Sequence, residues 1–212
     1  MPMKQDKKSV VPEPAAAPVP EKLSGGVLFE LDYLAASGRK IQFEALRDVL
    51  ARQKFKLDAV FFCQHCLNAG PDHYLPLVIE QGDLKKVTVE NLLEEYRAAV
   101  AKEWKGASIR LQPALEKLLK VAAARQMRLG AVTEWPLEMA QPLFDHLQLQ
   151  ALGVTLYSLP ELGSPCPRAD VWLKITRALG RRPRHCIAVT TSMVACKSAL
   201  ARWAMLSTGQ VS

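Results

Sequence analysis

The C-terminal half of the chain alternates between short apolar runs and amphipathic segments, which limits the possible folds more than any other feature. The runs RLGAVT, LGVTLYSL and HCIAVTT predict strands, whereas PALEKLLKVAAARQ, LEMAQPLFDHL, PRADVWLKITRALG and MVACKSALARWA predict helices. An earlier strand is predicted at about residues 26–31, after Gly25 and Gly26. Strands that alternate with helices form a parallel sheet covered on both faces. We therefore expect a Rossmann-like α/β fold whose site lies beyond the carboxyl ends of the strands.

A helical insert is predicted between the first and second strands. Apolar residues there recur at intervals of three and four, as in the stripe Val89, Leu92, Tyr96 and Val100. The breakers NAGPD and QGD divide this region into about four helices over residues 40–106. Residues 25–39 and 107–212 are then expected to form one α/β core, interrupted by the insert.

Residues 1–24 are rich in Pro, Ala and Lys and contain no aromatic residue, which predicts a disordered tail. The prolines break any continuous apolar region of a signal peptide. No apolar run approaches the roughly 18 to 20 residues that span a bilayer, so no transmembrane segment is expected. The five cysteines form no disulfide framework, which favours a reducing compartment. We expect a cytoplasmic protein.

The formal charge of +7 favours anionic partners in general without naming one. Much of the surplus lies in KITRALGRRPRH, from Lys174 to Arg184, where no acidic residue intervenes. One interpretation is a solvated helix C-terminus whose cations complement the helix dipole. The other is a docking patch for nucleic acid, lipid head groups or an acidic protein. We favour the first and do not expect nucleic acid as the partner.

Polar residues follow each predicted strand, in the segments LFELDY, AVTEWP, SLPELGSPCP and AVTTSM. Their order, with a helical insert after the first, resembles the haloacid dehalogenase superfamily, in the capped branch of phosphoglycolate-phosphatase-like and β-phosphoglucomutase-like enzymes. The resemblance covers the chain from about Gly26 to Ala204. It implies a parallel-sheet core with a helical cap and the machinery of a magnesium-dependent phosphatase.

The first motif of that family is Asp-x-Asp followed by Gly-Thr. The first aspartate attacks phosphorus and the second acts as general acid and base. On this resemblance Glu30 takes the nucleophile position and Asp32 keeps the acid/base position, while Tyr33 and Leu34 replace Gly-Thr. The extra methylene of glutamate moves the attacking oxygen by about 1 Å, which can cost about 100-fold in rate.

The other three motifs are also altered or uninformative. Thr133 fits the hydroxyl residue that holds the phosphate in the family, and Trp135 close by either packs in the core or roofs a shallow pocket. SPCP stands where the family has Lys-Pro-x-Pro, so Ser164 falls on the lysine. Thr191, in TTS, falls on an aspartate that binds magnesium. Glu30, Asp32 and Thr191 thus hold the family's magnesium positions.

Three charged positions of the family are changed together, which favours a catalytically inactive pseudophosphatase. Such a protein would bind a partner protein or a small anionic ligand through the former phosphatase cleft, with no cofactor. The main alternative is a slow phosphatase for a small phosphorylated metabolite, which would need magnesium. A second alternative is an adaptor for nucleic acid or membranes that uses the basic segment and the tail.

The motif CQHC places Cys63 and Cys66 three positions apart, with His65 and His73 nearby. A structural zinc site needs four ligands, usually from two separated pairs, and there is no second Cys-x-x-Cys. Redox chemistry is the other functional interpretation. We favour a pair of thiols one turn apart in a helix of the insert.

Overall fold

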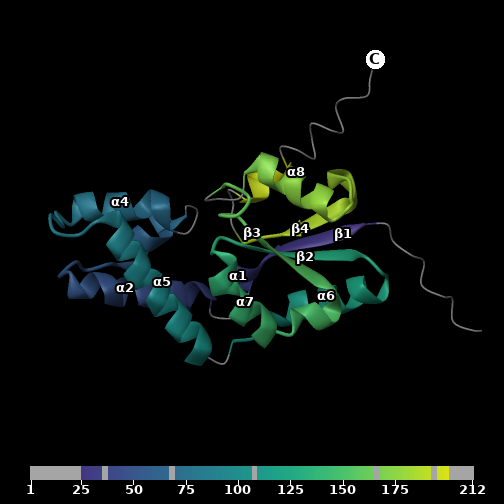
Figure 1. Ribbon diagram of the computed structural model, residues 1–212, viewed down its shortest axis with the longest axis horizontal. Helices are drawn as coiled ribbons and strands as arrows, with labels where there is room; N and C mark the ends of the chain where they lie inside the picture. Colours follow the sequence, from purple (N-terminus) through teal and green to yellow (C-terminus); the bar gives the residue numbers. More distant parts are fainter. Residues whose placement is uncertain are drawn as a thin grey trace, which may run out of the picture.

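The computed structural model describes residues 25–34, 38–66, 70–106, 109–164, 168–191 and 195–200, so the predicted tail lies outside the described residues. Four strands form one sheet: β1 (Gly26–Glu30), β2 (Arg128–Thr133), β3 (Val154–Ser158) and β4 (Cys186–Val189). Their order is β3-β2-β1-β4, and every neighbouring pair is parallel (Figure 1). The predicted α/β fold is therefore confirmed.

Helices cover both faces of the sheet. α6 (Pro113–Ala124) and α7 (Leu137–His146) lie below it in Figure 1, and α8 (Ala169–Ala178) lies above it. Successive side chains of a strand point to opposite faces. Phe29 of β1 accordingly belongs to the core cluster shared with α6 and α7, whereas Leu28 packs in the cluster that contains Trp172 of α8. Residues 195–200 are helical and add Ala195 and Ala199 to the second cluster.

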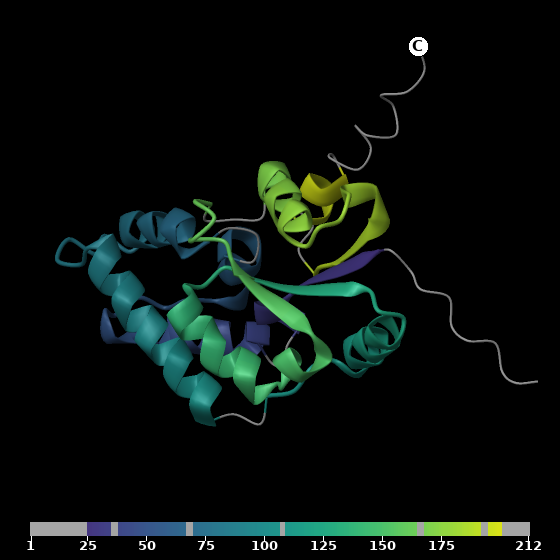
Figure 2. The same cartoon turned by 45° about the vertical axis from the view of Figure 1, so that its right-hand side comes forward.

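The remaining helices come between β1 and β2. They are α1 (Leu31–Leu34), α2 (Gly38–Arg52), α3 (Ala59–Phe61), the π-helical turn η1 (Phe62–Cys66), α4 (Pro71–Gln81) and α5 (Val89–Gly106). We call α2 to α5 the helical insert; it lies beside the sheet in Figures 1 and 2. Leu92, Tyr96 and Val100 of the predicted stripe are buried, and α2 packs along α5. The amphipathic pattern of α5 thus forms the centre of the insert.

The end of the basic segment lies at the amino ends of the strands, whereas Lys174 at its start donates to Leu162 O in the loop after β3. The segment leads through the short 3-10 helix η3 (Pro183–His185) into β4, whose first residue, Cys186, pairs with Gly26 at the start of β1. Another 3-10 helix, η2 (Leu149–Leu152), precedes β3. The described helices include none with the length and apolar composition needed to cross a membrane.

Candidate functional site

The carboxyl ends of β1, β2 and β4 bring together polar residues that are far apart in the sequence. Glu30 is the last residue of β1, and Thr133 is the last residue of β2. Thr190 and Thr191 follow directly after β4. Parallel strands end at the same edge of a sheet, so these side chains meet there with Asp32 of α1.

Asp32 is held by two donors from the end of β2. The Thr133 hydroxyl donates to Asp32 Oδ1 at 2.6 Å, and the backbone N–H of Glu134 donates to Oδ2 at 2.7 Å. Only 1% of Asp32 is exposed. Burial raises the pKa of Asp32 to about 7, against the two hydrogen bonds that lower it, and the charge of Glu30 raises it further. Asp32 therefore exchanges its proton near neutral pH.

Glu30 is held from the end of β4. Its Oε2 accepts hydrogen bonds from the Thr190 hydroxyl at 2.6 Å and from the backbone N–H of Thr191 at 3.2 Å. Glu30 is 4% exposed. The Thr191 hydroxyl accepts a hydrogen bond of 2.6 Å from Arg39 Nη2 on α2, and this contact is exposed. The sequence analysis named Thr191 as a site residue but missed Thr190. Thr190 could have been found, because it comes directly after an apolar predicted strand.

An aromatic cluster joins the end of β2 to the helical insert. Trp135 is buried, with its ring centroid 5.4 Å from that of Tyr96 and 5.9 Å from that of Trp104, both on α5. Tyr74 of α4 makes a side-chain hydrogen bond with Tyr96, and burial raises the pKa of the Tyr96 hydroxyl. Aromatic pairs in such tilted and edge-on arrangements stabilise beyond their buried area. The insert is thus packed directly on the strand-end loop, and Trp135 both packs in the core and lines a pocket, the two roles that the sequence left open.

Ser164 lies on a pocket beside this cluster. It is buried, and its backbone N–H donates to Leu159 O at 3.0 Å. The pocket measures about 310 Å³ and is lined by Pro71, Arg97, Glu134, Trp135, Pro160, Gly163 and Ser164. Arg97 comes from α5, and its Nε is buried without a hydrogen-bond partner. Nothing in the sequence singled out Arg97, because its place at this pocket depends on how α5 packs on the core.

The residues at the magnesium positions of the resemblance are the carboxylates Glu30 and Asp32 and the hydroxyl of Thr191. Mg²⁺ favours several hard oxygen ligands, carboxylates above all. Thr191 offers a hydroxyl that binds the Arg39 guanidinium, where the resemblance implies a carboxylate. Within the described residues, no group of three or more His, Cys, Asp or Glu side chains is placed to hold a metal ion.

Two other predicted features can be placed. Leu34 is buried in α1, and the side chain of Tyr33 lies outside the described part of the chain. Cys63 and Cys66 lie in η1, where Cys63 is exposed and Cys66 is buried. Burial raises the pKa of Cys66 to about 12. Since the thiolate is the reactive form of cysteine, this pKa argues against redox chemistry at Cys66.

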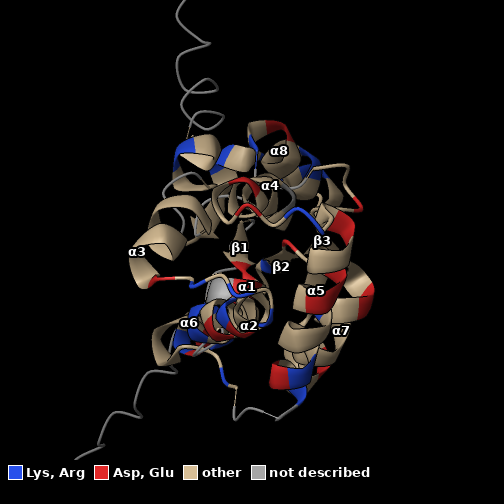
Figure 3. Ribbon diagram, turned by 90° about the vertical axis from the view of Figure 1, so that its left-hand side faces the viewer, with Lys and Arg blue, Asp and Glu red and all other residues tan. Residues whose placement is uncertain are grey.

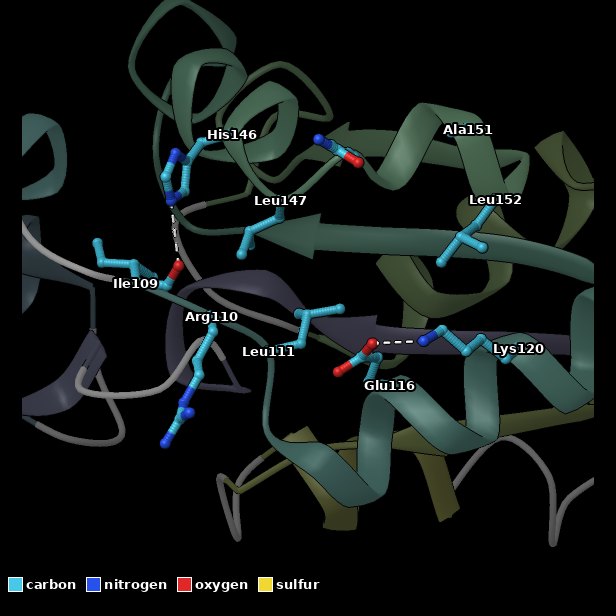
Figure 4. Close-up of a pocket in the computed structure, with 10 residues that line it drawn as sticks. Ile109, Arg110, Leu111, Glu116, Lys120, His146, Leu147, Ala151 and Leu152 are labelled. Atoms are coloured by element: carbon cyan, nitrogen blue, oxygen red, sulfur yellow. Dashed lines mark hydrogen bonds and ion pairs between the residues drawn. The ribbon is translucent and has the colours of Figure 1, made fainter.

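A separate groove of about 370 Å³ lies between α6, the end of α7 and the segment 109–111 that leads out of the insert. Figure 4 shows that its polar groups mainly bind one another. Lys120 Nζ pairs with Glu116 Oε1 at 2.6 Å, and His146 Nε2 lies 3.1 Å from Ile109 O. The Arg110 side chain points away from the other lining residues (Figure 4). This groove therefore offers a ligand mainly apolar contacts.

Comparison with known proteins supports the fold. No family model and no curated protein sequence matches the chain. Among solved structures, CbbY from Rhodobacter sphaeroides in complex with phosphate is 18% identical, with a TM-score of 0.70 and 83% of each chain covered. A HAD hydrolase of family IA from Entamoeba histolytica is 15% identical (TM-score 0.69, 84% of this chain and 81% of that one). A predicted phosphoglycolate phosphatase from Haemophilus somnus is 16% identical (TM-score 0.67, 84% and 82%).

Proposed function

From the haloacid dehalogenase-like fold that this chain shares with those structures, we propose that it is a relative without phosphatase turnover. It acts by binding a partner protein or a small anionic ligand. In this proposal residues 25–39 and 107–212 form the core, and residues 40–106 form the cap.

The observation that carries the proposal is the burial of both carboxylates. A nucleophilic carboxylate must reach phosphorus in line with the leaving group. Glu30 and Asp32 are 4% and 1% exposed, and both accept hydrogen bonds from their neighbours. The Thr133 hydroxyl, which the resemblance assigns to phosphate, donates to Asp32 instead. A phosphate ester would have to displace these contacts to approach the carboxylates.

The charges at the strand ends support the same proposal. A transferred phosphoryl group is stabilised by fixed positive charge. Ser164 and Thr191 are neutral where the resemblance implies a lysine and a magnesium-binding aspartate. The contacts of Trp135 with Tyr96 and Trp104 also oppose opening of the cap, which a substrate would need to enter.

The test is hydrolysis of p-nitrophenyl phosphate with and without magnesium by the unmodified protein and by Glu30→Ala. We expect equal rates, because a placed nucleophile and a metal are needed together. Magnesium-dependent hydrolysis well above the Glu30→Ala control would overturn the proposal. If the three charged positions are the only defects, the combination Glu30→Asp, Ser164→Lys and Thr191→Asp restores turnover, and each change alone does not.

A slow phosphatase is the second candidate, and one observation favours it. The pKa of Asp32 is about 7, which suits a general acid and base at neutral pH because both protonation states are populated. On this reading, activity above the Glu30→Ala control would also require Asp32, so Asp32→Asn would abolish it.

A further inference from the structure

The strand ends lack the lysine that the resemblance implies, but a cation from the helical insert lies close by. Arg97 of α5 lines the same pocket as Ser164, the residue at the lysine position. We propose that Arg97 supplies this missing charge and that the pocket binds a small oxyanion, a phosphate or a carboxylate. The inference rests on the proposed function, since it names the kind of ligand that a protein without turnover would hold.

The state of the guanidinium group supports this assignment. Arg97 Nε is buried and has no hydrogen-bond partner, and within the described residues no carboxylate forms an ion pair with Arg97. The charge of Arg97 is therefore not neutralised by a carboxylate contact in the described part of the chain, and Arg97 lines the pocket in which a ligand oxygen would lie. Arginine also presents its donors as a planar fork that matches carboxylate and phosphate oxygens.

The surroundings of Arg97 show on which side an anion would bind. A second groove on the other side of Arg97 is lined by Glu90, Glu94 and Glu138, on α5 and α7. Figure 3, which looks onto the helical insert, shows acidic residues on both α5 and α7. Three carboxylates would repel an anion there. The pocket with Ser164 has one carboxylate, Glu134, and is therefore the side on which an anion is stabilised.

The size of the pocket restricts the ligand. Its volume of about 310 Å³ is at the lower end of the roughly 300 to 1,000 Å³ that small-molecule sites occupy. This volume suits a compact molecule. Trp135 contributes an apolar wall, and Ser164 brings a hydroxyl that can donate to or accept from the ligand.

Calorimetric titration with inorganic phosphate tests the inference. Arg97→Gln should weaken binding about tenfold or more, because it removes a charge-assisted hydrogen bond. Lys102→Gln, with the same change of charge on the exposed side of α5, should leave affinity within about twofold. Glu134→Gln should tighten binding, because the pocket loses its only described carboxylate. In a parallel titration with sodium acetate, the affinities of the variants should rank in the same order.

Two results would overturn the inference. One is phosphate and acetate both failing to bind the unmodified protein. The other is phosphate binding that Arg97→Gln leaves unchanged, or that Glu134→Gln weakens. The inference and the proposed function fail separately, because calorimetry measures the Arg97 pocket, whereas comparison with Glu30→Ala measures turnover. Glu134→Gln keeps the test decisive if Arg97→Gln does not fold.

Discussion

The two sides of the strand-end site hold similar carboxylates in different surroundings. On the β2 side, Asp32 is bound by Thr133 and the Glu134 backbone, next to the Trp135 cluster. On the β4 side, Glu30 is bound by Thr190, beyond which the hydrogen bond of Arg39 to Thr191 is exposed. On the β2 side the Asp32 carboxylate is thus wholly buried beside the aromatic cluster, whereas on the β4 side the contacts of Glu30 continue to an exposed hydrogen bond.

This difference teaches that the exposure of the surrounding contacts, more than residue type, decides what each carboxylate contributes. A buried acid held by two donors behaves as part of the core, and its environment raises its pKa. A carboxylate whose donors reach solvent exchanges those contacts with water at lower cost. The β2 side should therefore dominate stability.

The largest expected effect is the loss of the aromatic cluster on the β2 side. Trp135→Ala should lower the free energy of unfolding by about 3 to 5 kcal/mol, because it leaves a cavity between β2 and α5. Urea denaturation measures this loss. Val121→Ala on α6, where the side chain is 43% exposed, is the control and should change stability by about 0.5 kcal/mol or less. Similar losses for both variants would show that the contacts of Trp135 with α5 do not stabilise the fold.

The next effect is the pH dependence due to Asp32. Its pKa is raised from 3.8 to about 7 in the folded state, so the folded protein holds a proton that the unfolded chain releases. The contribution to stability is full below pH 3.8 and is lost as the pH rises through 7. Between pH 5 and 8, the unmodified protein should lose about 2 to 3 kcal/mol relative to Asp32→Asn.

Unfolding curves at several pH values for both proteins provide this measurement. The comparison uses only how steeply the free energy of unfolding changes with pH in the two proteins. The substitution of Asp32 also changes hydrogen bonds, but it does so at every pH. Val121→Ala should keep the slope of the unmodified protein. Parallel curves for the unmodified protein and Asp32→Asn would contradict a buried, proton-exchanging Asp32.

The smallest effect compares the two threonines. Thr133→Val removes a donor to the wholly buried Asp32 and should cost about 1 to 3 kcal/mol. Thr190→Val makes the same change beside Glu30, in a part-buried hydrogen bond, and should cost about 1 kcal/mol or less. Thermal unfolding of the two variants at pH 8 compares them directly. An equal or larger loss of stability in Thr190→Val would contradict the expectation that the β2 side contributes more to stability than the β4 side.

Local patterns in the sequence were enough to predict the scaffold. The run RLGAVT became β2 without a shift, and the stripe on α5 is buried as its spacing indicates. Such elements follow from alternation and periodicity, which need only neighbouring residues. The meeting of Glu30, Thr133 and Thr191 followed from one further step, that parallel strands end at one edge.

The hydrogen-bond and packing partners of the site side chains could not be predicted from the sequence. The Thr133 hydroxyl binds Asp32 across 101 residues, and the place of Thr190 after an apolar strand did not show that its hydroxyl donates to Glu30. The contact of Trp135 with Tyr96, and the place of Arg97, depend on how α5 packs on the core. These features are set by tertiary packing of side chains, which hydrophobic periodicity does not encode.

The strand order has a consequence for how the chain is made. β1 is wholly buried inside the sheet. Thr190, which donates to Glu30 at the end of β1, comes 160 residues after Glu30 in the chain. A ribosome adding 5 to 20 residues per second therefore completes this side of the sheet roughly 8 to 30 s after it has made β1. The helices of the insert have their partners much earlier, since α2 packs on α5. During synthesis GVLF therefore waits for β4, its last neighbour in the sheet, until almost all of the described chain has been made.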